Sequence, residues 1–421
     1  MNDVLTPSIN AFVIGIDSYH HDSILSIEDS LNELKDLART AGMSVIQIVS
    51  QKQKHPVRGT YLGKGKIEEI KASIASQSIQ CVLVDDDLTP AQSKFLEATF
   101  NVKVLDRTGL ILDIFAQRAQ TYEAKLQVEL AQLHYLLPRL TRLWTHLSRL
   151  GGGIGTRGPG ETQLEVDKRQ LSVRVSHIKT KLKKIKKDRD LRRSKRHQLP
   201  TIKGALVGYT NAGKSTLMNR LTQSSVLTEN KLFATLDPIS RKFKFKHSEQ
   251  IILTDTVGFI QKLPTLLIKA FYSTLEEVTD ADFLLHVVDV SHPCFDEFIQ
   301  TSNHIISDLN ASDKPILYIF NKWDRVKNPN MIKKKLSAFQ PHICISTQYD
   351  SNLDVFETAL EDLLAPLKKT LTFFIPYQRM DIINLFHQFG SVESVTYNEE
   401  VTIKVTINEI LAEKIMACLY K

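Results

Sequence analysis

The chain has 421 residues, of which 42% are hydrophobic and 24% are charged, so it can form roughly two to four domains with a core each. Its apolar runs are far shorter than the ~20 residues of a membrane-spanning helix, and its first ten residues lack the features of a targeting segment. The four cysteines are scattered, which excludes a Cys-x-x-Cys zinc site and a disulfide framework. We therefore expect a cytoplasmic protein without stable membrane insertion.

The net charge of +7 is concentrated in one segment, which we call the basic block. Residues 168–197 hold 14 Lys or Arg against only Asp188 and Asp190, which leaves −5 for the rest of the chain. Such a block is most often a solvated helix face or a tail. It also suits a polyanion such as RNA, or an acidic membrane surface.

Residues 10–117 alternate apolar runs with helical stretches. The expected strands are Phe12–Ile14, Val45–Val49, Cys81–Val84 and Val102–Leu105, and the expected helices are Glu28–Ala41, Lys66–Ser76 and Pro90–Thr99. This order predicts a βαβ domain with a mainly parallel sheet. The segment Gly59–Lys66 opens one helix and could hold a phosphate or RNA there, but it lacks the full phosphate-loop spacing, so a structural turn is favoured.

From about residue 121 the apolar residues follow the four–three spacing of a coiled coil. The first set is Leu126, Leu130, Leu133, Leu137, Leu140, Trp144 and Leu147, and the second is Leu164, Leu171, Val175, Ile178, Leu182 and Ile185. Each set gives one helix an apolar face, so we expect an antiparallel helical hairpin with the basic block on solvent faces of its second helix. Pro138 predicts a kink or a new helix start.

The connection between the two helices is rich in glycine. Residues 151–160 read Gly-Gly-Gly-Ile-Gly-Thr-Arg-Gly-Pro-Gly and contain six of the chain's 17 glycines. Glycine has no Cβ and admits positive φ, so this loop can approach another backbone or a phosphate closely. A flexible linker is the alternative, but linkers usually mix in Ser and acidic residues. We expect a binding loop.

Residues 208–215 fit the phosphate-loop motif G-x-x-x-x-G-K-[ST] fully. They follow the apolar run Gly204–Val207 and precede the helix-like run Thr216–Leu221, which is the context that the motif requires. The N–H groups of the loop form an anion site, Lys214 neutralises the β- and γ-phosphates, and the Ser215 hydroxyl binds Mg²⁺. A P-loop nucleotide-binding domain is therefore predicted from about residue 200.

Asn321-Lys322-Trp323-Asp324 forms an N-K-x-D motif directly after the predicted strand Ile316–Phe320. The Asp324 carboxylate can accept from guanine N1–H and from the N2 amine, whereas adenine would leave it unpaired at a cost of ~1–3 kcal/mol or more. Lys322 would lie along the base plane, and Asn321 would support the loop. The motif predicts GTP and GDP as the ligands.

The motif Asp255-Thr256-Val257-Gly258 follows the predicted strand Ile251–Leu253. Asp255 would hold Mg²⁺ through water, and the Gly258 N–H would contact the γ-phosphate. Thr235 is the candidate switch threonine, whose hydroxyl and carbonyl would complete the Mg²⁺ and γ-phosphate contacts. The candidate catalytic residues are Lys214, Thr235 and Gly258, and the candidate metal ligands are Ser215, Thr235 and Asp255. The remaining predicted nucleotide contacts are Gly208, Tyr209, Thr210, Asn211, Ala212, Gly213, Thr216, Phe233, Ala234, Leu236, Asp237, Thr256, Val257, Asn321, Lys322, Trp323, Asp324, Ser346 and Thr347.

Phe259 stands directly after this motif, where many GTPases carry a glutamine that orients the attacking water. A phenyl ring neither donates nor accepts a hydrogen bond, so we expect slow intrinsic hydrolysis that a partner accelerates. Asn211 indicates a further ion, because GTPases with asparagine here can use it to help hold K⁺ near the phosphates. The expected cofactors are Mg²⁺ and K⁺.

The C-terminal residues are expected to form a small α+β domain. Its predicted order is strand Leu371–Ile375, helix Met380–Gln388, strands Val392–Tyr397 and Val401–Ile407, and helix Ile410–Leu419. The predicted fold is α/β, with four parts: an α/β domain over 1–120, the hairpin over 121–199, a P-loop G domain over 200–367 and the α+β domain over 368–421.

With these motifs in view, the sequence resembles the HflX family of ribosome-associated bacterial GTPases. The resemblance spans nearly the whole chain and is carried by residues 63–70, 137–141, 151–165, 208–217, 233–237 and 255–259. The glycine-rich loop with its flanks is specific to the family, whereas the G-domain motifs are shared by many GTPases. In place of the usual Ser-Ala of the guanine-contacting loop, this chain has Ser346-Thr347, whose backbone N–H would contact guanine O6.

The resemblance implies a cytoplasmic, monomeric GTPase that docks on the large ribosomal subunit, hydrolyses GTP faster there, and separates stalled or idle ribosomes. The rRNA contacts would come from the glycine loop and the basic block. The residues assigned to these contacts are Gly153, Arg157, Gly158, Lys183, Lys184, Lys186 and Lys187. Two alternatives stay open: a GTPase of ribosome assembly or tRNA metabolism, and a GTP-dependent regulator of a membrane protease.

Overall fold

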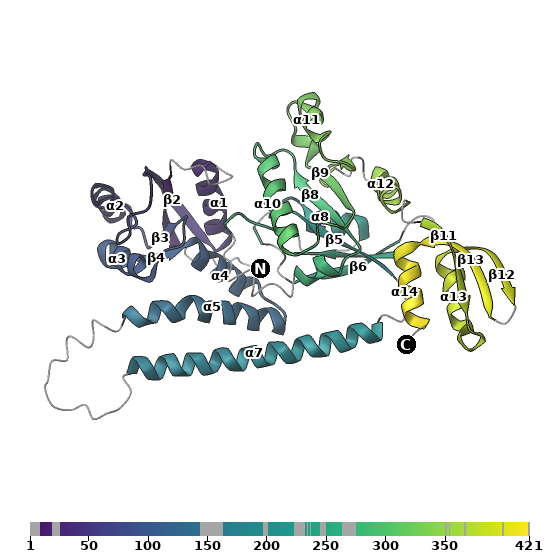
Figure 1. Cartoon of the computed structure of the whole chain (residues 1–421). Helices are drawn as coiled ribbons and strands as arrows, with labels where there is room; N and C mark the ends of the chain where they lie inside the picture. The colour runs from purple at the N-terminus through teal and green to yellow at the C-terminus, as the bar shows by residue number, and fades with distance from the viewer. Residues whose placement is uncertain are drawn as a thin grey trace, which may run out of the picture. The chain divides into compact units, whose positions relative to one another are not determined.

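The structure is a computed structural model of the chain (Figure 1). It describes residues 9–18, 26–143, 163–196, 201–222, 232–233, 235, 237–244, 250–262, 275–349, 352, 354–365, 368–397 and 400–419. Internal contacts divide the chain into two units. Unit 1 is Met1–Lys184, Glu229–Leu236 and Lys262–Tyr272, and unit 2 is Ile185–Thr228, Asp237–Gln261 and Ser273–Lys421. Among the described residues, no helix is both long and apolar enough to cross a membrane.

Unit 1 contains a four-stranded parallel sheet in the order β2-β1-β3-β4. The strands are β1 (Ile9–Asp17), β2 (Met43–Lys52), β3 (Cys81–Val84) and β4 (Lys103–Asp106), and the helices between them are α1 (Ile27–Thr40), α2 (Lys64–Ser76) and α3 (Pro90–Phe100). Every residue of β3 is buried, as expected for a strand covered on both faces. The predicted parallel βαβ arrangement is confirmed.

One helix of unit 1 was not predicted. α4 (Arg107–Arg118) follows β4, and the Asp106 carboxylate caps it by accepting from the Gly109 N–H at 2.8 Å. Its apolar residues Leu110, Ile111, Ile114 and Phe115 are buried and recur at helical spacing, so both the cap and the pattern were readable in the sequence.

Two long helices follow, α5 (Tyr122–Leu143) and α7 (Gln163–Arg196). They run alongside each other in Figure 1, and Arg174 Nε donates to Glu129 Oε1 at 2.6 Å between them. Val175 and Ile178, on the predicted apolar face of α7, are buried. The predicted helical hairpin is therefore confirmed.

The alternative that a new helix starts at Pro138 is wrong, because α5 continues through this residue. Proline removes one backbone donor from a helix interior. The guanidinium of the next residue, Arg139, donates to the Tyr135 carbonyl at 3.0 Å and to Asp106 Oδ2 at 2.6 Å. The second bond ties α5 to the end of β4 one residue beyond the proline.

Unit 2 contains a six-stranded sheet in the order β10-β9-β8-β5-β7-β6. Its strands are β5 (Ile202–Val207), β6 (Ile239–Lys244), β7 (Gln250–Asp255), β8 (Phe283–Asp289), β9 (Ile316–Asn321) and β10 (His342–Cys344). All neighbours are parallel except β6, an unpredicted edge strand antiparallel to β7. Its helices are α8 (Lys214–Thr222), α10 (Phe295–Asp308), α11 (Pro329–Leu336) and α12 (Asp354–Leu364). The carboxyl ends of β5, β7, β8 and β9 share one edge, where the predicted motifs begin.

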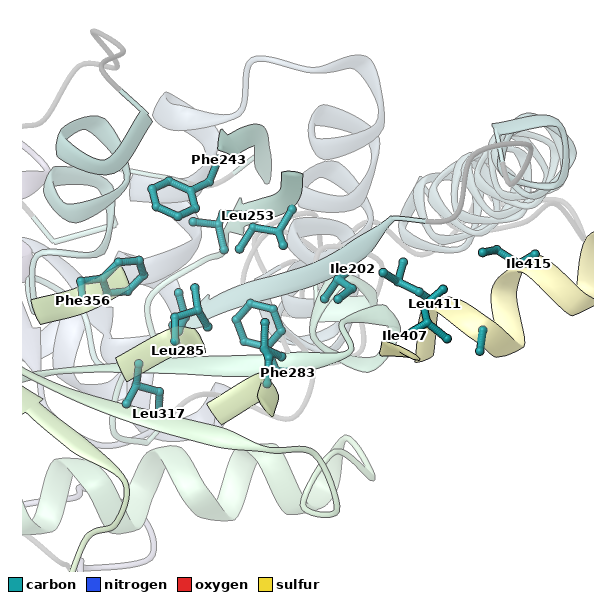
Figure 2. Close-up of a cluster of buried hydrophobic side chains, with 14 of the residues drawn as sticks. Ile202, Phe243, Leu253, Phe283, Leu285, Leu317, Phe356, Ile407, Leu411 and Ile415 are labelled. Carbon is teal, nitrogen blue, oxygen red and sulfur yellow. The ribbon is translucent and has the colours of Figure 1, made fainter. Parts of the chain in front are cut away.

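The C-terminal part of unit 2 is a three-stranded antiparallel sheet in the order β11-β13-β12. Its elements are β11 (Lys368–Ile375), α13 (Met380–Phe389), β12 (Ser391–Tyr397), β13 (Val401–Asn408) and α14 (Glu409–Leu419), in the predicted order. One cluster of buried side chains joins this part to the six-stranded sheet, and Figure 2 shows it running from Phe243 and Phe283 through Ile202 to Leu411 and Ile415.

Candidate nucleotide-binding site

The phosphate loop connects β5 to α8, and its geometry requires glycine at two positions. Gly208 has a φ of +140° and Gly213 a φ of +98°. A Cβ on Gly208 would lie 2.1 Å from the carbonyl oxygen of Val287, and a Cβ on Gly213 would lie 2.2 Å from Asn321 Nδ2. The loop is therefore seated directly against β8 and against the start of the N-K-x-D motif.

Lys214 is the buried cation of this loop. Its Nζ donates to the carbonyl oxygens of Gly208 at 3.0 Å and Tyr209 at 2.8 Å. Burial lowers the pKa of Lys214 to about 8, and the charge of Asp255 acts in the opposite direction. Burial, with the charge of Lys214, also lowers the pKa of His286 on β8 to about 3, so that side chain is neutral. A buried lysine against main-chain carbonyls gains stability when a phosphate approaches.

Ser215 and Asp255 bring two hard oxygen ligands together. Ser215 Oγ donates to Asp255 Oδ2 at 2.6 Å, although the residues are 40 positions apart in the chain. A hydroxyl and a carboxylate beside a phosphate site are the ligands that Mg²⁺ prefers. The donor set therefore fits the magnesium ion that P-loop GTPases use with their nucleotide.

The segment after Asp255 runs along the phosphate loop as a short parallel bridge between Tyr209 and Phe259. Thr210 N–H donates to the Phe259 carbonyl at 2.8 Å, and Phe259 N–H donates to the Gly208 carbonyl at 3.0 Å. A Cβ on Gly258 would lie 2.8 Å from Thr210 Cα. The ring of Phe259 is buried, with 2% of its surface exposed, so this residue contributes its backbone and not its side chain.

Sequence reasoning missed how Tyr209 holds this segment. Its hydroxyl accepts from the Gln261 N–H at 2.8 Å, and its ring stacks on Phe298 of α10 with centroids 4.0 Å apart. Tyr209 was predicted only as a member of the phosphate loop. Its aromatic side chain was the one indication in the sequence of such a role, because the phosphate-loop motif requires no aromatic residue at this position.

The residues predicted to recognise guanine are joined through Asn321, which is fully buried. Its Nδ2 donates to the Ala212 carbonyl at 2.9 Å, and its Oδ1 accepts from the Thr347 N–H at 3.1 Å. Ser346 Oγ donates to the Asp324 carboxylate. The phosphate loop, the N-K-x-D motif and Ser346-Thr347 therefore form one arrangement.

Lys322 is held by a partner that sequence reasoning did not find. Its Nζ lies 2.6 Å from Asp289 Oδ2 at the end of β8, and its backbone has a φ of +61°. The sequence offered one sign, since Asp289 ends a buried strand beside the one that carries Asn321. This ion pair holds the aliphatic chain of Lys322 in one position.

The segment 232–237 is described only in part, and its first residues belong to unit 1. Leu232 N–H donates to Thr40 Oγ1 at 3.3 Å, and the buried ring of Phe233 meets Phe115 edge-on with centroids 4.6 Å apart. Thr235 and Asp237 are half-buried, while Ala234 and Leu236 lie outside the described residues. The nucleotide contacts assigned to this segment stay a prediction.

The residues assigned to rRNA fall into two groups. Lys183, Lys184, Lys186 and Lys187 are exposed on α7. Gly153, Arg157 and Gly158, with the whole loop 151–160, lie outside the described residues. The basic block is also not purely solvated, because Lys186 Nζ lies 2.8 Å from Glu276 Oε1.

Comparison with known proteins identifies the family of the chain. Family models described as GTP-binding GTPase N-terminal, GTP-binding GTPase Middle Region and 50S ribosome-binding GTPase match residues 28–116, 118–196 and 203–322. GTPase HflX of Caldanaerobacter subterraneus subsp. tengcongensis is 46% identical over 391 residues, which cover 92% of this chain and 90% of that protein. The chain belongs to the HflX family of GTPases. GTPase HflX of Escherichia coli (strain K12) is 39% identical over 382 residues, 90% of this chain and 89% of that protein.

A solved structure is also similar to this HflX GTPase. It is a GTP-binding protein from the hyperthermophilic archaeon Sulfolobus solfataricus in complex with GDP, 25% identical, covering 85% of this chain and 99% of that chain with a TM-score of 0.45. Family membership and the P-loop domain establish that the present chain is a GTP hydrolase.

Proposed function

We propose that this GTPase is a cytoplasmic monomer that binds the large ribosomal subunit and separates stalled or idle ribosomes. The observation that carries the proposal is the exposed row of lysines at 183, 184 and 187 on α7, within a block that holds 14 basic residues. Such a row attracts RNA phosphates through counterion release, and the helix follows a glycine-rich loop slim enough for an rRNA cavity. The match of the G domain to a family described as ribosome-binding supports the same partner.

In the proposed reaction Lys214 neutralises the β- and γ-phosphates, and Gly258 N–H contacts the γ-phosphate as it leaves. Asp324 accepts from guanine N1–H and N2, while Asn321 and Lys322 hold the base in place. Ser215 and Thr235, with Asp255 through water, would hold Mg²⁺, which supplies positive charge to the phosphate oxygens when bound. Ser346 and Thr347 lie beside the guanine base, and a backbone N–H of this pair donates to its O6 atom.

Phe259 itself offers the attacking water no hydrogen-bonding side chain, because its ring is buried and apolar. We therefore expect slow turnover by the free protein and acceleration by K⁺ held partly by Asn211, whose φ of +60° places it at the turn of the phosphate loop. Replacing K⁺ by Na⁺ at equal ionic strength should lower GTP turnover a few-fold, and Asn211→Ala should remove the difference. Equal rates in the two salts would refute the role of K⁺.

Turnover of GTP with and without purified large subunits tests the ribosomal partner. We expect acceleration by large subunits and co-sedimentation with them that weakens as salt rises. Acceleration by assembly intermediates or tRNA alone would favour the alternative of ribosome assembly or tRNA metabolism. If no RNA changes GTP turnover and the protein binds a membrane protease, the alternative of a GTP-dependent protease regulator would be favoured.

Two variants separate the loop from the basic block. Shortening residues 151–160 to a two-residue turn should leave intrinsic GTP hydrolysis unchanged and should strongly reduce ribosome separation. Replacing lysines 183, 184 and 187 by glutamate should instead lower ribosome affinity and flatten its salt dependence. If the loop-shortened protein splits ribosomes at the parent's rate, the glycine loop is only a connector.

A further inference from the structure

The carboxylate of Glu276 binds two cations of the basic block. Lys186 Nζ lies 2.8 Å from Oε1, and Arg189 Nη2 lies 2.5 Å from Oε2. All three residues belong to unit 2. The Glu276 side chain is 11% exposed, whereas Lys186 keeps 56% of its side chain exposed, so a second anion can reach the same ammonium.

Glu276 lies on a helical segment that is fixed to the nucleotide-binding sheet. Residues 275–280 are helical, and Leu275 and Val278 are buried. Lys314 Nζ donates to the Thr279 carbonyl at 2.7 Å and also to that of Ala281. β8 begins directly afterwards at Phe283.

β8 in turn supports two parts of the nucleotide site. The Val287 carbonyl is the group that a Cβ on Gly208 would meet, and Asp289 binds Lys322. A change in the position of Glu276 therefore has a short route through β8 to the phosphate loop and to the N-K-x-D motif.

A phosphate and a carboxylate compete for the same N–H donors of lysine and arginine. A partly exposed ion pair is weak, whereas a polyanion brings several phosphates to one helix. RNA on α7 can therefore displace Glu276 from Lys186 and Arg189.

We propose that Glu276 competes with the phosphates of a bound RNA for Lys186 and Arg189, and that this competition couples RNA binding on α7 to the nucleotide site through residues 275–282 and β8. This proposal depends on the proposed function only because it takes RNA as the polyanion that binds α7. Because such coupling is reciprocal, the bound nucleotide changes RNA affinity by the same factor.

The competition is tested by Glu276→Gln in the full chain, with Glu361→Gln on α12 as the matched control, since Glu361 is exposed and loses the same charge. The probe is fluorescent poly(U) RNA, titrated against the GDP-loaded protein from about 50 to about 300 mM KCl. Glu276→Gln should bind about tenfold tighter at low salt, and its log–log salt slope should be steeper by about 0.7 for each donor released to a phosphate. Glu361→Gln should match the parent. A parental slope and affinity for Glu276→Gln would overturn the competition.

The coupling is tested by comparing RNA affinity with GDP and with a non-hydrolysable GTP analogue. The parent should show different affinities, and Glu276→Gln should show one affinity for both. The double variant Lys186→Gln with Arg189→Gln should lose the difference by itself, and adding Glu276→Gln to it should change nothing more. Equal parental affinities in the two nucleotide states would refute the coupling. The ribosomal proposal would survive that result, because its own readout is GTP turnover with large subunits.

Discussion

Both units contain a mainly parallel sheet with charged residues at or just beyond the carboxyl ends of its strands, yet the two edges use these charges differently. In unit 1, Asp85 follows β3 and is completely buried. Its carboxylate accepts from Arg107 Nη1 at 2.7 Å, Lys262 Nζ at 2.6 Å and Ser30 Oγ at 2.7 Å. Asp106, the last residue of β4, is similarly bound by Arg139 and Tyr135. These charges are neutralised within the unit.

At the edge of the sheet in unit 2, the central cation contacts main-chain carbonyls, although Lys322 at the same edge pairs with Asp289. Lys214 donates to Gly208 and Tyr209, and Asp324 accepts from the neutral hydroxyl of Ser346. A charged phosphate binds a lysine more strongly than neutral carbonyl groups do. A guanine can donate to the Asp324 carboxylate in addition to the Ser346 hydroxyl. The carboxyl edge of a parallel sheet is a common place for ligands, and in unit 2 it presents a lysine that donates to carbonyls where the edge in unit 1 presents carboxylates bound to cations.

Among the variants that test the difference between the two sheet edges, Lys214→Ala is expected to have the largest effect. The phosphates lose their buried cation, so GTP affinity should fall about 1000-fold and turnover should be lost. Titration with a fluorescent GTP analogue measures the change, and Lys333→Ala, an exposed lysine on α11, is the control. Near-parental affinity would show that the loop at 208–215 is not the phosphate site.

Arg107→Met tests the edge in unit 1. Removing this cation leaves Asp85 buried with fewer partners, which should lower the stability of unit 1 by about 3 kcal/mol. Amide hydrogen exchange in Cys81–Val84 should accelerate accordingly, while GTP affinity should stay within about twofold of the parent. A tenfold loss of GTP affinity with unchanged exchange would mean that this edge takes part in binding.

Asp324→Asn tests whether the carboxylate near Ser346 reads the base. An amide offers a donor where guanine N1–H needs an acceptor, so the preference for GTP over xanthosine triphosphate should fall by ~1–3 kcal/mol. Competition binding gives the ratio directly. Ser346→Ala, which removes only the hydroxyl that orients the carboxylate, should shift it less. An unchanged ratio in Asp324→Asn would refute the assignment.

The motifs and most elements could be predicted because they depend on local pattern. The phosphate loop is contiguous, and the strands around it are apolar runs bounded by turns. What could not be predicted depends on contacts between distant residues. Asn321 reaches Ala212 across 109 positions, Glu276 reaches Arg189 across 87, and Phe233 is buried beside Phe115. Composition and spacing carry no information about such pairs.

The local errors had physical causes as well. A helix start at Pro138 was a reasonable prediction from the missing donor, but α5 continues through this residue with one backbone donor fewer. α4 was overlooked although its capping residue Asp106 and its apolar spacing were both readable in the sequence. β6 was overlooked because an edge strand buries only one face, and only Phe243 of its six residues is buried.

The smallest expected effect concerns the protonation of Lys214 on nucleotide binding. Burial lowers its pKa to about 8 in the free protein, and bound phosphates favour the charged form and raise that pKa. Binding should therefore take up protons above pH 7, about half a proton at pH 8, and GTP affinity should fall about twofold between pH 7 and pH 8 from this group. Calorimetry at pH 8 in two buffers of different ionisation enthalpy measures the uptake. Lys214→Arg, whose guanidinium stays charged, should show none of it. Equal uptake in the two proteins would assign the proton to another group, and the cation at this edge would then be charged before the nucleotide arrives.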